Sequence, residues 1–573
     1  MNPSTVVGGP PPFNKGGKTS FPLFTLHSPL STLYLFLIMC KPQALCAYEL
    51  LYGKNNGRYR IVRKRRFFIN AAIMTGSALL SRTLGMGFRV YMSNTIGANG
   101  IGLFQLICSI YFFCVTFATS GITLIATRTV TECFARGENA KGRRFTTLCL
   151  YSALALSLTA AALLYAFSIP ICDNILGDTR AALSLRVMAL GLPFLALSAC
   201  FRGYFYARRK AYITAGEQLL EQITEIVIFA ALAGTLAPLG IEYACCAVAL
   251  GATGAEILSF IYTYYLYRRD VRRFRYTPVT GTGFFRKALS IGVPVTLSST
   301  VRNGLSAAEN VLIPRGLNGY GHSVNDSLSK YGIIAGMAMP LLTFPSAFLL
   351  SFSTLMIPEL ADAAATVKKS SIRHMTEKVL RFAFLFSAPA AAVFFFFANS
   401  IGTMLFRETE VTAYIRILAP IVPLFYLDSV IDGMLKGLNE QLHYLTYNII
   451  DSAVRVALIT VLLPAFGIKG LIVVFFVSGI LNTGLSLMRL IKVSEVNFKI
   501  TDWVIKPLIC AALPCVLLSL LQAFVPFMQN SLCTVLFLLL SLSAYLLLIC
   551  AVGAVSKSEL DLRSYLSPKA VKK

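Results

Sequence analysis

The chain has 573 residues, of which 56% are hydrophobic and only 14% are charged, and its mean hydropathy is +0.68. Soluble domains carry about 25% charged residues, so this composition excludes a soluble protein and indicates a polytopic membrane protein. The net charge of +26 comes from Lys and Arg residues that cluster between apolar blocks, which argues against a nucleic-acid-binding surface.

Residues 1–65 are expected to form a separate basic extension. Residues 1–20 are rich in Gly, Pro, Ser and Asn, which is typical of a disordered segment. The apolar run STLYLFLIMC at 31–40 is too short to span a membrane comfortably. Two interpretations stay open for this extension: an artefact of an upstream start site, or a segment that lies in the membrane interface.

After residue 65 the sequence is a series of apolar blocks of about twenty residues, the length that a helix needs to cross a bilayer core. This series predicts an all-α membrane protein with about fourteen transmembrane helices. In chain order, the helices are expected at 70–94, 101–126, 146–170, 182–206, 214–236, 240–266, 286–312, 329–355, 379–402, 411–435, 443–465, 467–490, 505–526 and 531–553.

The distribution of Lys and Arg supports this count, because every second loop is basic, as loops on the cytoplasmic side are. The basic segments lie at 63–66, 136–144, 208–210, 268–275, 368–373, 436, 489–499 and 569–573. The loops between them are poor in basic residues, for example SNTIGANG at 93–100 and TLAPLG at 235–240. We therefore expect both termini in the cytoplasm and a tight external turn at GANGIG, residues 97–102.

An internal repeat divides the helices into two halves. The segment that begins at Leu192 aligns with the segment that begins at Val422, at a constant offset of 230 in the numbering. The offset pairs Pro193 with Pro423, Gly203 with Gly433, Glu221 with Asp451 and Gly102 with Gly332. Unless the similarity of Leu-rich helices arose by chance, it predicts two six-helix lobes as parallel repeats. The expected domains are 66–280 and 281–495 for the lobes, 496–556 for two C-terminal helices, and 557–573 for a cytoplasmic tail.

Ionisable side chains in membrane helices are costly, by about 2.5 to 3.5 kcal/mol, so they normally face a cavity or a partner. One candidate set lies on the predicted first and seventh helices: Arg82, Arg89, Arg302, Asn303 and Glu309. A second set has one-turn spacing on the fifth and eleventh helices: Glu217, Glu221, Glu225, Asp451 and Arg455.

Two interpretations stay open for these groups. In the first, arginines line a cavity and hold an anionic, phosphate-bearing substrate, because a guanidinium is permanently charged and can donate two hydrogen bonds to phosphate. In the second, the groups form buried ion pairs, such as Arg455 with Asp451 or with a glutamate of the fifth helix. We favour substrate binding for the first set, and ion coupling or ion pairing for the second.

No metal, cofactor or catalytic site is predicted. The sequence has no HExxH motif and no pair of CxxC motifs, and its four histidines are far apart. The fourteen cysteines lie mostly in apolar blocks and are interpreted as small buried hydrophobic residues. We expect no enzymatic activity, because no arrangement of nucleophile, base and oxyanion donors can be named.

Several separate stretches resemble one known family, the stage V sporulation protein B group of polysaccharide exporters. Residues 85–132 resemble its first two helices, and ACFRGYFYARRKAYITAGEQLLEQITEI at 199–226 resembles a further signature. NVLIPRGL at 310–317, residues 328–363 and DGMLKGLNEQ at 432–441 are similar as well. The resemblance covers about residues 66–556.

This group is part of the multidrug/oligosaccharidyl-lipid/polysaccharide flippase superfamily. The resemblance implies two six-helix lobes around a central cavity, two extra helices, and movement of an undecaprenyl-linked sugar precursor from the inner to the outer leaflet. The related lipid II flippases carry a second cationic group in the region of the eighth helix. Residues 331–345 have no charged residue here, which leaves the substrate open and shifts this role to Arg302.

The sequence thus predicts a flippase or exporter of an undecaprenyl-linked oligosaccharide or peptidoglycan precursor, acting as a monomer in the cytoplasmic membrane by alternating access. Its expected partners are the lipid-linked sugar and membrane lipids, and a coupling ion is left open. One alternative is a multidrug or cation antiporter in which carboxylates of the fifth helix bind the ion or proton. Another is a non-transporting scaffold for cell-wall synthesis, which predicts no connected polar cavity between the lobes.

Overall fold

The computed structural model describes residues 56–135, 137–272, 283–365, 369–524 and 531–552, and no strand occurs among them. The chain divides into two compact units, Met1–Phe68 and Ile69–Lys573, and the description that follows concerns the second, whose first helix begins in the first unit at Asn56. Residues 1–55 of the predicted N-terminal extension and the whole predicted tail, 557–573, lie outside the described residues.

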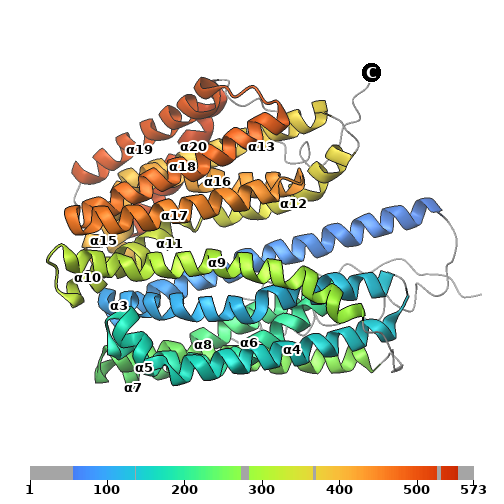
Figure 1. Cartoon of the computed structure of the whole chain (residues 1–573). Helices are drawn as coiled ribbons and strands as arrows, with labels where there is room; N and C mark the ends of the chain where they lie inside the picture. The colour runs from blue at the N-terminus through green and yellow to red at the C-terminus, as the bar shows by residue number, and fades with distance from the viewer. Residues whose placement is uncertain (1–55, 136, 273–282, 366–368, 525–530, 553–573) are drawn as a thin grey trace, which may run out of the picture. The chain divides into compact units, whose positions relative to one another are not determined.

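Long helices make up the second unit, and they run roughly parallel or antiparallel to one another (Figure 1). The longer helices are α3 (Asn56–Ala135), α4 (Asn139–Ala166), α6 (Ala182–Ala207), α7 (Ala211–Leu236), α8 (Ile241–Val271), α9 (Gly283–Gly319), α12 (Ser346–Ala365), α13 (Lys369–Phe396), α16 (Val422–Gly437), α17 (Gln441–Phe466), α18 (Ile468–Ser494), α19 (Lys506–Phe524) and α20 (Ser531–Ala551).

Short helical segments connect or extend these long helices. They are α5 (Ser168–Pro170), η1 (Ile171–Leu176), η2 (Thr179–Ala181), η3 (Ala237–Leu239), α10 (Val324–Tyr331), η4 (Gly332–Ala338), α11 (Met339–Thr343), α14 (Ala398–Leu405), α15 (Glu410–Leu418), η5 (Ala419–Ile421) and η6 (Thr501–Ile505).

Helix α3 contains a break that the sequence analysis placed in an external loop. Residues 93–100 are helical except for Gly97, whose φ of 72° and ψ of 175° leave the helical region. A residue with a side chain rarely adopts this positive φ, so glycine is the residue that permits the break. Figure 1 shows α3 as two long arms that run in opposite directions. The turn expected within residues 97–102 is therefore an interruption at one residue, and the helices on either side of it extend beyond their predicted ends at 94 and 101.

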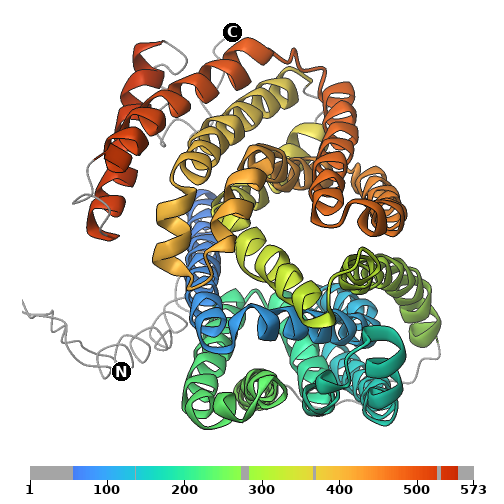
Figure 2. The same cartoon turned by 90° about the vertical axis from the view of Figure 1, so that its left-hand side faces the viewer.

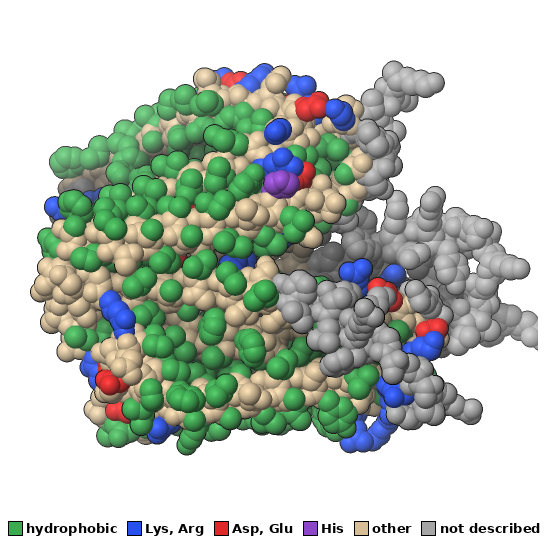
Figure 3. Space-filling model, in the orientation of Figure 1, with side chains coloured by type: hydrophobic (Ala, Val, Ile, Leu, Met, Phe, Trp, Pro, Cys, Tyr) green, Lys and Arg blue, Asp and Glu red, His purple; other side chains and the backbone are tan. Residues whose placement is uncertain are grey.

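Eleven stretches of described helix are long and apolar enough to cross a membrane, or twelve if the bent pair Val324–Thr343 and Ser346–Thr354 is one span. One of the eleven, Thr75–Phe134, has 60 residues and includes the break at Gly97. Hydrophobic side chains cover most of the face in Figure 3, and charged side chains gather mainly toward the helix ends. These features confirm an all-α polytopic membrane protein, whereas the count of fourteen helices stays a prediction.

The helix boundaries repeat with the offset that the sequence suggested. Both ends of α13 follow the ends of α4 at this offset, and both ends of α17 follow those of α7 at the same offset. The packing repeats as well: α4, α7 and α8 each contact α6 and α7 contacts α8, just as α13, α17 and α18 each contact α16 and α17 contacts α18. Helices α19 and α20 have no counterpart in this pairing and pack on α13 (Figure 2).

Candidate functional site

A cavity of about 570 Å³ lies among α3, α6, α7, α8 and α9. Its walls combine apolar side chains with polar groups that are unusual in helices of this hydropathy. A volume of this size is typical of small-ligand sites. The polar lining residues are Arg89, Gln105, Ser109, Thr116, Glu221, Glu225, Glu256, Asn303, Ser306 and Asn310.

Three carboxylates line this cavity. Glu221 and Glu225 are one turn apart on α7, so they lie on the same face of that helix, and Glu256 comes from α8. The Oε2 atom of Glu256 is buried and has no hydrogen-bond partner among the described residues. Arg89, on the half of α3 before the break, is half-buried and lies close enough to Glu225 for their charges to interact. The cavity therefore holds more negative than positive formal charge.

Glu217, the third glutamate of the predicted stripe, lies one turn before Glu221 but has a different environment. Its side chain is completely buried, and its Oε1 atom accepts hydrogen bonds from Arg202 at 2.9 Å and from Ser259 at 3.1 Å. The contact joins α6, α7 and α8 next to the cavity wall. Glu217 thus belongs to a buried ion pair, while the other two glutamates of the stripe line the cavity.

The predicted arginines do not all reach the cavity. Arg82 and Arg302 are exposed and are not among its lining residues. Within the described ranges, neither side chain makes a hydrogen bond or an ion pair. Asn303 does line the cavity, and its amide donates a hydrogen bond to the hydroxyl of Thr116 on α3. Adjacent helical residues point about 100° apart, which explains why Asn303 faces the cavity and Arg302 does not.

Glu309 is also directed away from the cavity and forms a buried network with α17 and α18. Arg455 donates to Glu309 at 3.1 Å and to Asp451 at 2.8 Å, and Ser478 donates to Asp451 at 2.7 Å. The carboxylates of Glu309 and Asp451 are buried, with side-chain exposures of 9% and 3%. The second carboxylate partner of Arg455 is therefore Glu309 of α9, whereas the sequence analysis had named a glutamate of the fifth helix.

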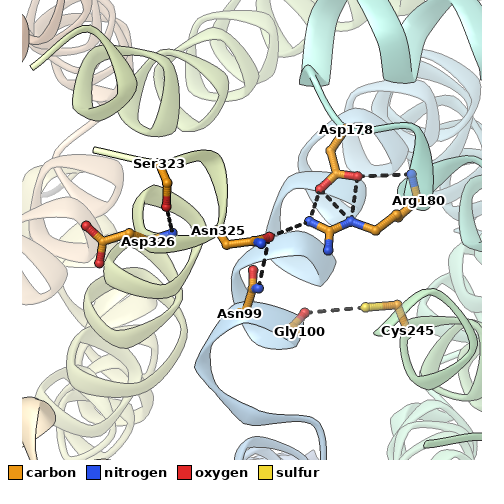
Figure 4. A network of polar contacts seen from close by, with 8 residues as sticks. All are labelled: Asn99, Gly100, Asp178, Arg180, Cys245, Ser323, Asn325 and Asp326. Carbon is orange, nitrogen blue, oxygen red and sulfur yellow. Dashed lines mark hydrogen bonds and ion pairs between the residues drawn. The ribbon is translucent and has the colours of Figure 1, made fainter. Parts of the chain in front are cut away.

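At one end of the unit, polar contacts join segments that are far apart in the sequence (Figure 4). Asn325, on α10, accepts hydrogen bonds from Arg180 at 2.9 Å and from Asn99 at 3.3 Å. Asp178 holds the Arg180 guanidinium at 2.6 Å. Nearby on α3, the amide of Asn94 donates to the carbonyl of Leu405 at 2.8 Å. We refer to these residues, with Gly102 and Gly332, as the closed end.

The glycines that the repeat paired, Gly102 and Gly332, touch each other at the closed end. A Cβ atom on Gly102 would lie 2.1 Å from the carbonyl oxygen of Leu328, and one on Gly332 would lie 2.1 Å from that of Ala98. Both distances are far below a normal contact, so only glycine allows the backbones to approach this closely. The two halves of the repeat therefore meet at equivalent positions.

Comparison with known proteins places the chain in a family. The model of the family described as polysaccharide biosynthesis protein matches residues 68–364, which are just over half of the chain. The chain belongs to this family. The matched segment includes α3 from its fourth turn onward, all of α4 to α11, and most of α12, so it contains every residue that lines the cavity.

The chain is similar to proteins of Bacillus subtilis (strain 168). It is 26% identical to stage V sporulation protein B over 447 residues, which cover 77% of the chain and 86% of that relative. It is 24% identical to the lipid II flippase MurJ over 206 residues, which cover 33% and 38% of the two chains. The resemblance predicted from the sequence motifs is thereby confirmed.

Two solved structures share the fold of this family member. The lipid II flippase MurJ in an inward closed conformation covers 87% of the chain with a TM-score of 0.64, and 100% of that structure is matched. An inward-facing multidrug resistance MATE family transporter of the MOP superfamily covers 74% of the chain with a TM-score of 0.59, and 99% of that structure is matched. Each is 14% identical to the chain, so the likeness concerns the fold alone.

Sequence reasoning did not single out two charged residues of this family member, Arg202 and Glu256. Both lie in apolar blocks, and the cost of placing a charge in a membrane helix was the signal that could have identified them. The sequence does not predict their partners. Arg202 contacts Glu217, which lies on another helix, and Glu256 lines a cavity that is formed by five helices.

Proposed function

We propose that this protein is a flippase or exporter that moves an undecaprenyl-linked oligosaccharide or peptidoglycan precursor across the cytoplasmic membrane by alternating access. Membership of the polysaccharide biosynthesis protein family and the similarity to a protein named as a lipid II flippase support this proposal. We propose that it acts as a monomer and that both termini lie in the cytoplasm; the distribution of basic loops supports this orientation.

The observation that carries the proposal is a polar cavity within apolar helices, together with a closed end on one side. A headgroup with phosphates and sugars needs hydrogen-bond donors and acceptors inside the membrane, and the cavity supplies both from five helices. The closed end contains Asn99, two residues after the break at Gly97, and the pattern of basic segments predicts this break on the external side. This arrangement fits a state that would admit substrate from the cytoplasm while the outside is sealed. A non-transporting scaffold would need neither feature.

In the proposed mechanism, the arginines act in sequence along the path of the headgroup. Arg82 and Arg302 are exposed and are proposed to make the first contact with the diphosphate. Arg89 lies two turns after Arg82, or about 10 Å along the same helix, and is proposed to hold the diphosphate inside the cavity with Asn303. Arginine suits both steps because its planar guanidinium can donate two parallel hydrogen bonds to phosphate oxygens.

The carboxylates of the cavity suggest how binding would be coupled to an ion. A diphosphate and three ionised glutamates would repel one another in a site of low dielectric constant. Protonation of Glu221, Glu225 or Glu256, or binding of a cation between them, would remove this repulsion. We therefore propose that substrate enters together with a proton or cation and that the ion is released with it.

A multidrug or cation antiporter is the second candidate function, and the same three carboxylates favour it. An acidic cavity attracts a cationic drug directly, without Arg82 or Arg302. The two functions therefore differ in their requirement for arginine. A flippase needs guanidinium groups on the substrate path, whereas an antiporter needs only the carboxylates.

Reconstitution of the full chain into vesicles that contain a fluorescent undecaprenyl-diphosphate-linked sugar would test this proposal. Loss of one charged hydrogen-bonding partner costs about 1.5 to 3 kcal/mol, so Arg89→Gln and Arg302→Gln should each weaken apparent substrate affinity by roughly tenfold to a hundredfold. Arg89→Lys should restore part of the affinity. Arg269→Gln, an exposed residue at the end of α8, is the matched control. Normal flipping by a well-folded Arg89→Gln, Arg302→Gln double variant would refute the proposed role of arginine.

A further inference from the structure

A second cavity, of about 390 Å³, lies at one end of α13, beside the segment that leads from α18 to α19. It shares no residue with the cavity described above. Its lining is unusually basic, with four Lys or Arg side chains and one carboxylate. The lining residues are Arg373, His374, Glu377, Lys378, Arg381, Phe382, Leu385, Asn497, Lys499 and Trp503. We refer to it as the basic pocket.

The carboxylate of the basic pocket does not cancel its positive charge. Glu377, the one carboxylate among the lining residues, accepts a hydrogen bond from Arg373 at 3.1 Å. Asp502, just outside the pocket, is held by Lys506 at 2.6 Å. Lys499 is exposed at the pocket, and the lining residues, counted by themselves, have a formal charge of +3. A pocket of this charge and size is suited to a phosphate-bearing headgroup.

Trp503 indicates the depth of the basic pocket relative to a membrane. It is the only Trp in the chain, it is 7% exposed, and it packs edge to face against Phe498 with 5.2 Å between ring centroids. Trp is enriched at the level of lipid headgroups, where one side of the indole is apolar and the other is polar. The apolar helix α19 begins just after it, at Lys506. The pocket thus lies where the headgroup region would meet the apolar core.

The surface that continues from the basic pocket into the membrane is apolar. Leu508, Ile509 and Leu513, on α19, are between 38% and 62% exposed. A molecule whose phosphate enters the pocket could therefore lay its acyl chains along α19. A free anion would make no use of this surface.

We propose that the basic pocket binds the anionic headgroup of a membrane phospholipid. Basic pockets between membrane helices bind anionic lipid headgroups elsewhere, and each Lys or Arg near such a surface contributes about fivefold in affinity. The bound lipid would join α13 to α19 and so fix the two C-terminal helices to the rest of the unit. This proposal is independent of the transported substrate.

Native mass spectrometry of the purified full chain, titrated with phosphatidylglycerol or phosphatidylcholine, would test the proposal. We expect phosphatidylglycerol to bind more tightly than phosphatidylcholine. The double variant Arg373→Gln, Lys499→Gln should weaken phosphatidylglycerol binding by roughly twentyfold. Its matched control is the double variant Arg268→Gln, Arg269→Gln, which removes two exposed cations from the end of α8 and should bind like the parent chain.

Three results would overturn the proposal. An equal loss of binding in the control variant would show attraction to overall charge rather than to the pocket. Displacement of phosphatidylglycerol by inorganic phosphate at similar concentration would identify a site for free anions. Displacement by undecaprenyl phosphate, with preference over phosphatidylglycerol, would identify a site for the lipid carrier of the transported substrate. Because no transport is measured, these results are distinct from failure of the proposed flippase activity.

Discussion

The contact between Gly102 and Gly332 predicts that a single methyl group can open the closed end. In Gly332→Ala, the new Cβ atom would lie 2.1 Å from the carbonyl oxygen of Ala98 and would also approach the backbone nitrogen of Gly102. A carbon atom and a carbonyl oxygen normally approach no closer than about 3.3 Å. The backbones must therefore separate by about 1.2 Å, because neither neighbour is a flexible side chain that could move aside.

The size of the effect follows from the cost of overpacking a well-packed contact. Forcing an extra methyl group into such a site typically costs about 1 to 3 kcal/mol. This cost applies only while the end is closed, because the proposed alternating access separates the two glycines when the end opens. The ratio of open to closed protein should therefore rise by roughly fivefold to a hundredfold. The same argument applies to Gly102→Ala, since its Cβ atom would meet the carbonyl oxygen of Leu328.

Labelling of a buried cysteine would measure this ratio. Ser327, on α10, is completely buried, and Ser327→Cys replaces only its side-chain oxygen with sulfur. A membrane-impermeant maleimide should react with this cysteine only when the closed end opens, and the parent chain supplies the background from the native cysteines. In the Gly332→Ala background the labelling rate of Ser327→Cys should rise by the same fivefold to hundredfold as the ratio of open to closed protein.

Gly234→Ala is the matched control for this experiment. Gly234 is an exposed helical glycine on α7, and its Cβ atom would meet nothing within 4 Å. The substitution should leave the labelling rate unchanged and should favour the helix slightly. An unchanged rate in Gly332→Ala, or an equal increase in Gly234→Ala, would refute the reasoning.

Two further predictions concern topology and the buried ion pairs. A cysteine at Leu239 should be labelled from outside intact cells, and one at Arg269 only from inside. The reason is that the loop at 235–240 is poor in basic residues and the loop at 268–275 is rich in them. Labelling of both cysteines from the same side would contradict the alternation of basic loops. Arg455→Met should lower the free energy of unfolding by about 3 to 5 kcal/mol, measured by thermal denaturation in detergent, because it leaves two buried carboxylates without a counter-charge. A loss below about 1 kcal/mol would show that the network is not a buried ion pair in energetic terms.

The repeat was the part of the fold that the sequence predicted best. An offset read from a few prolines and glycines agrees with the boundaries of α4 and α13 and of α7 and α17. It succeeded because those residues are fixed by backbone geometry. Gly203 and Gly433 show this directly, since a Cβ atom on either would press on Thr123 or Ser353, which are themselves related by the same offset. A larger residue at either position would require its neighbours to shift.

The direction of individual side chains was much harder to predict. Membrane helices are apolar on most of their surface, so their sequence pattern does not distinguish the side that faces lipid from the side that faces a cavity. Arg302 and Asn303 illustrate this limit, because the residue favoured for substrate binding is exposed and its neighbour lines the cavity. Contacts between residues that are distant in sequence were equally hard to predict, as the contact between Arg455 of α17 and Glu309 of α9 shows.

Helix α9 connects the cavity to the buried network that contains Arg455. Asn303 of this helix contacts Thr116 at the cavity, and Glu309, about 9 Å further along the helix, is held by Arg455 of α17. Breaking the buried ion pair would cost about 3 to 5 kcal/mol, whereas a single neutral hydrogen bond contributes about 1 kcal/mol. A change of access should therefore separate α9 from α3 at Asn303 and keep α9 and α17 together. Glu221 and Asp451 are equivalent in the repeat, yet Glu221 lines the cavity, whereas Asp451 belongs to the buried network that holds α9 against α17.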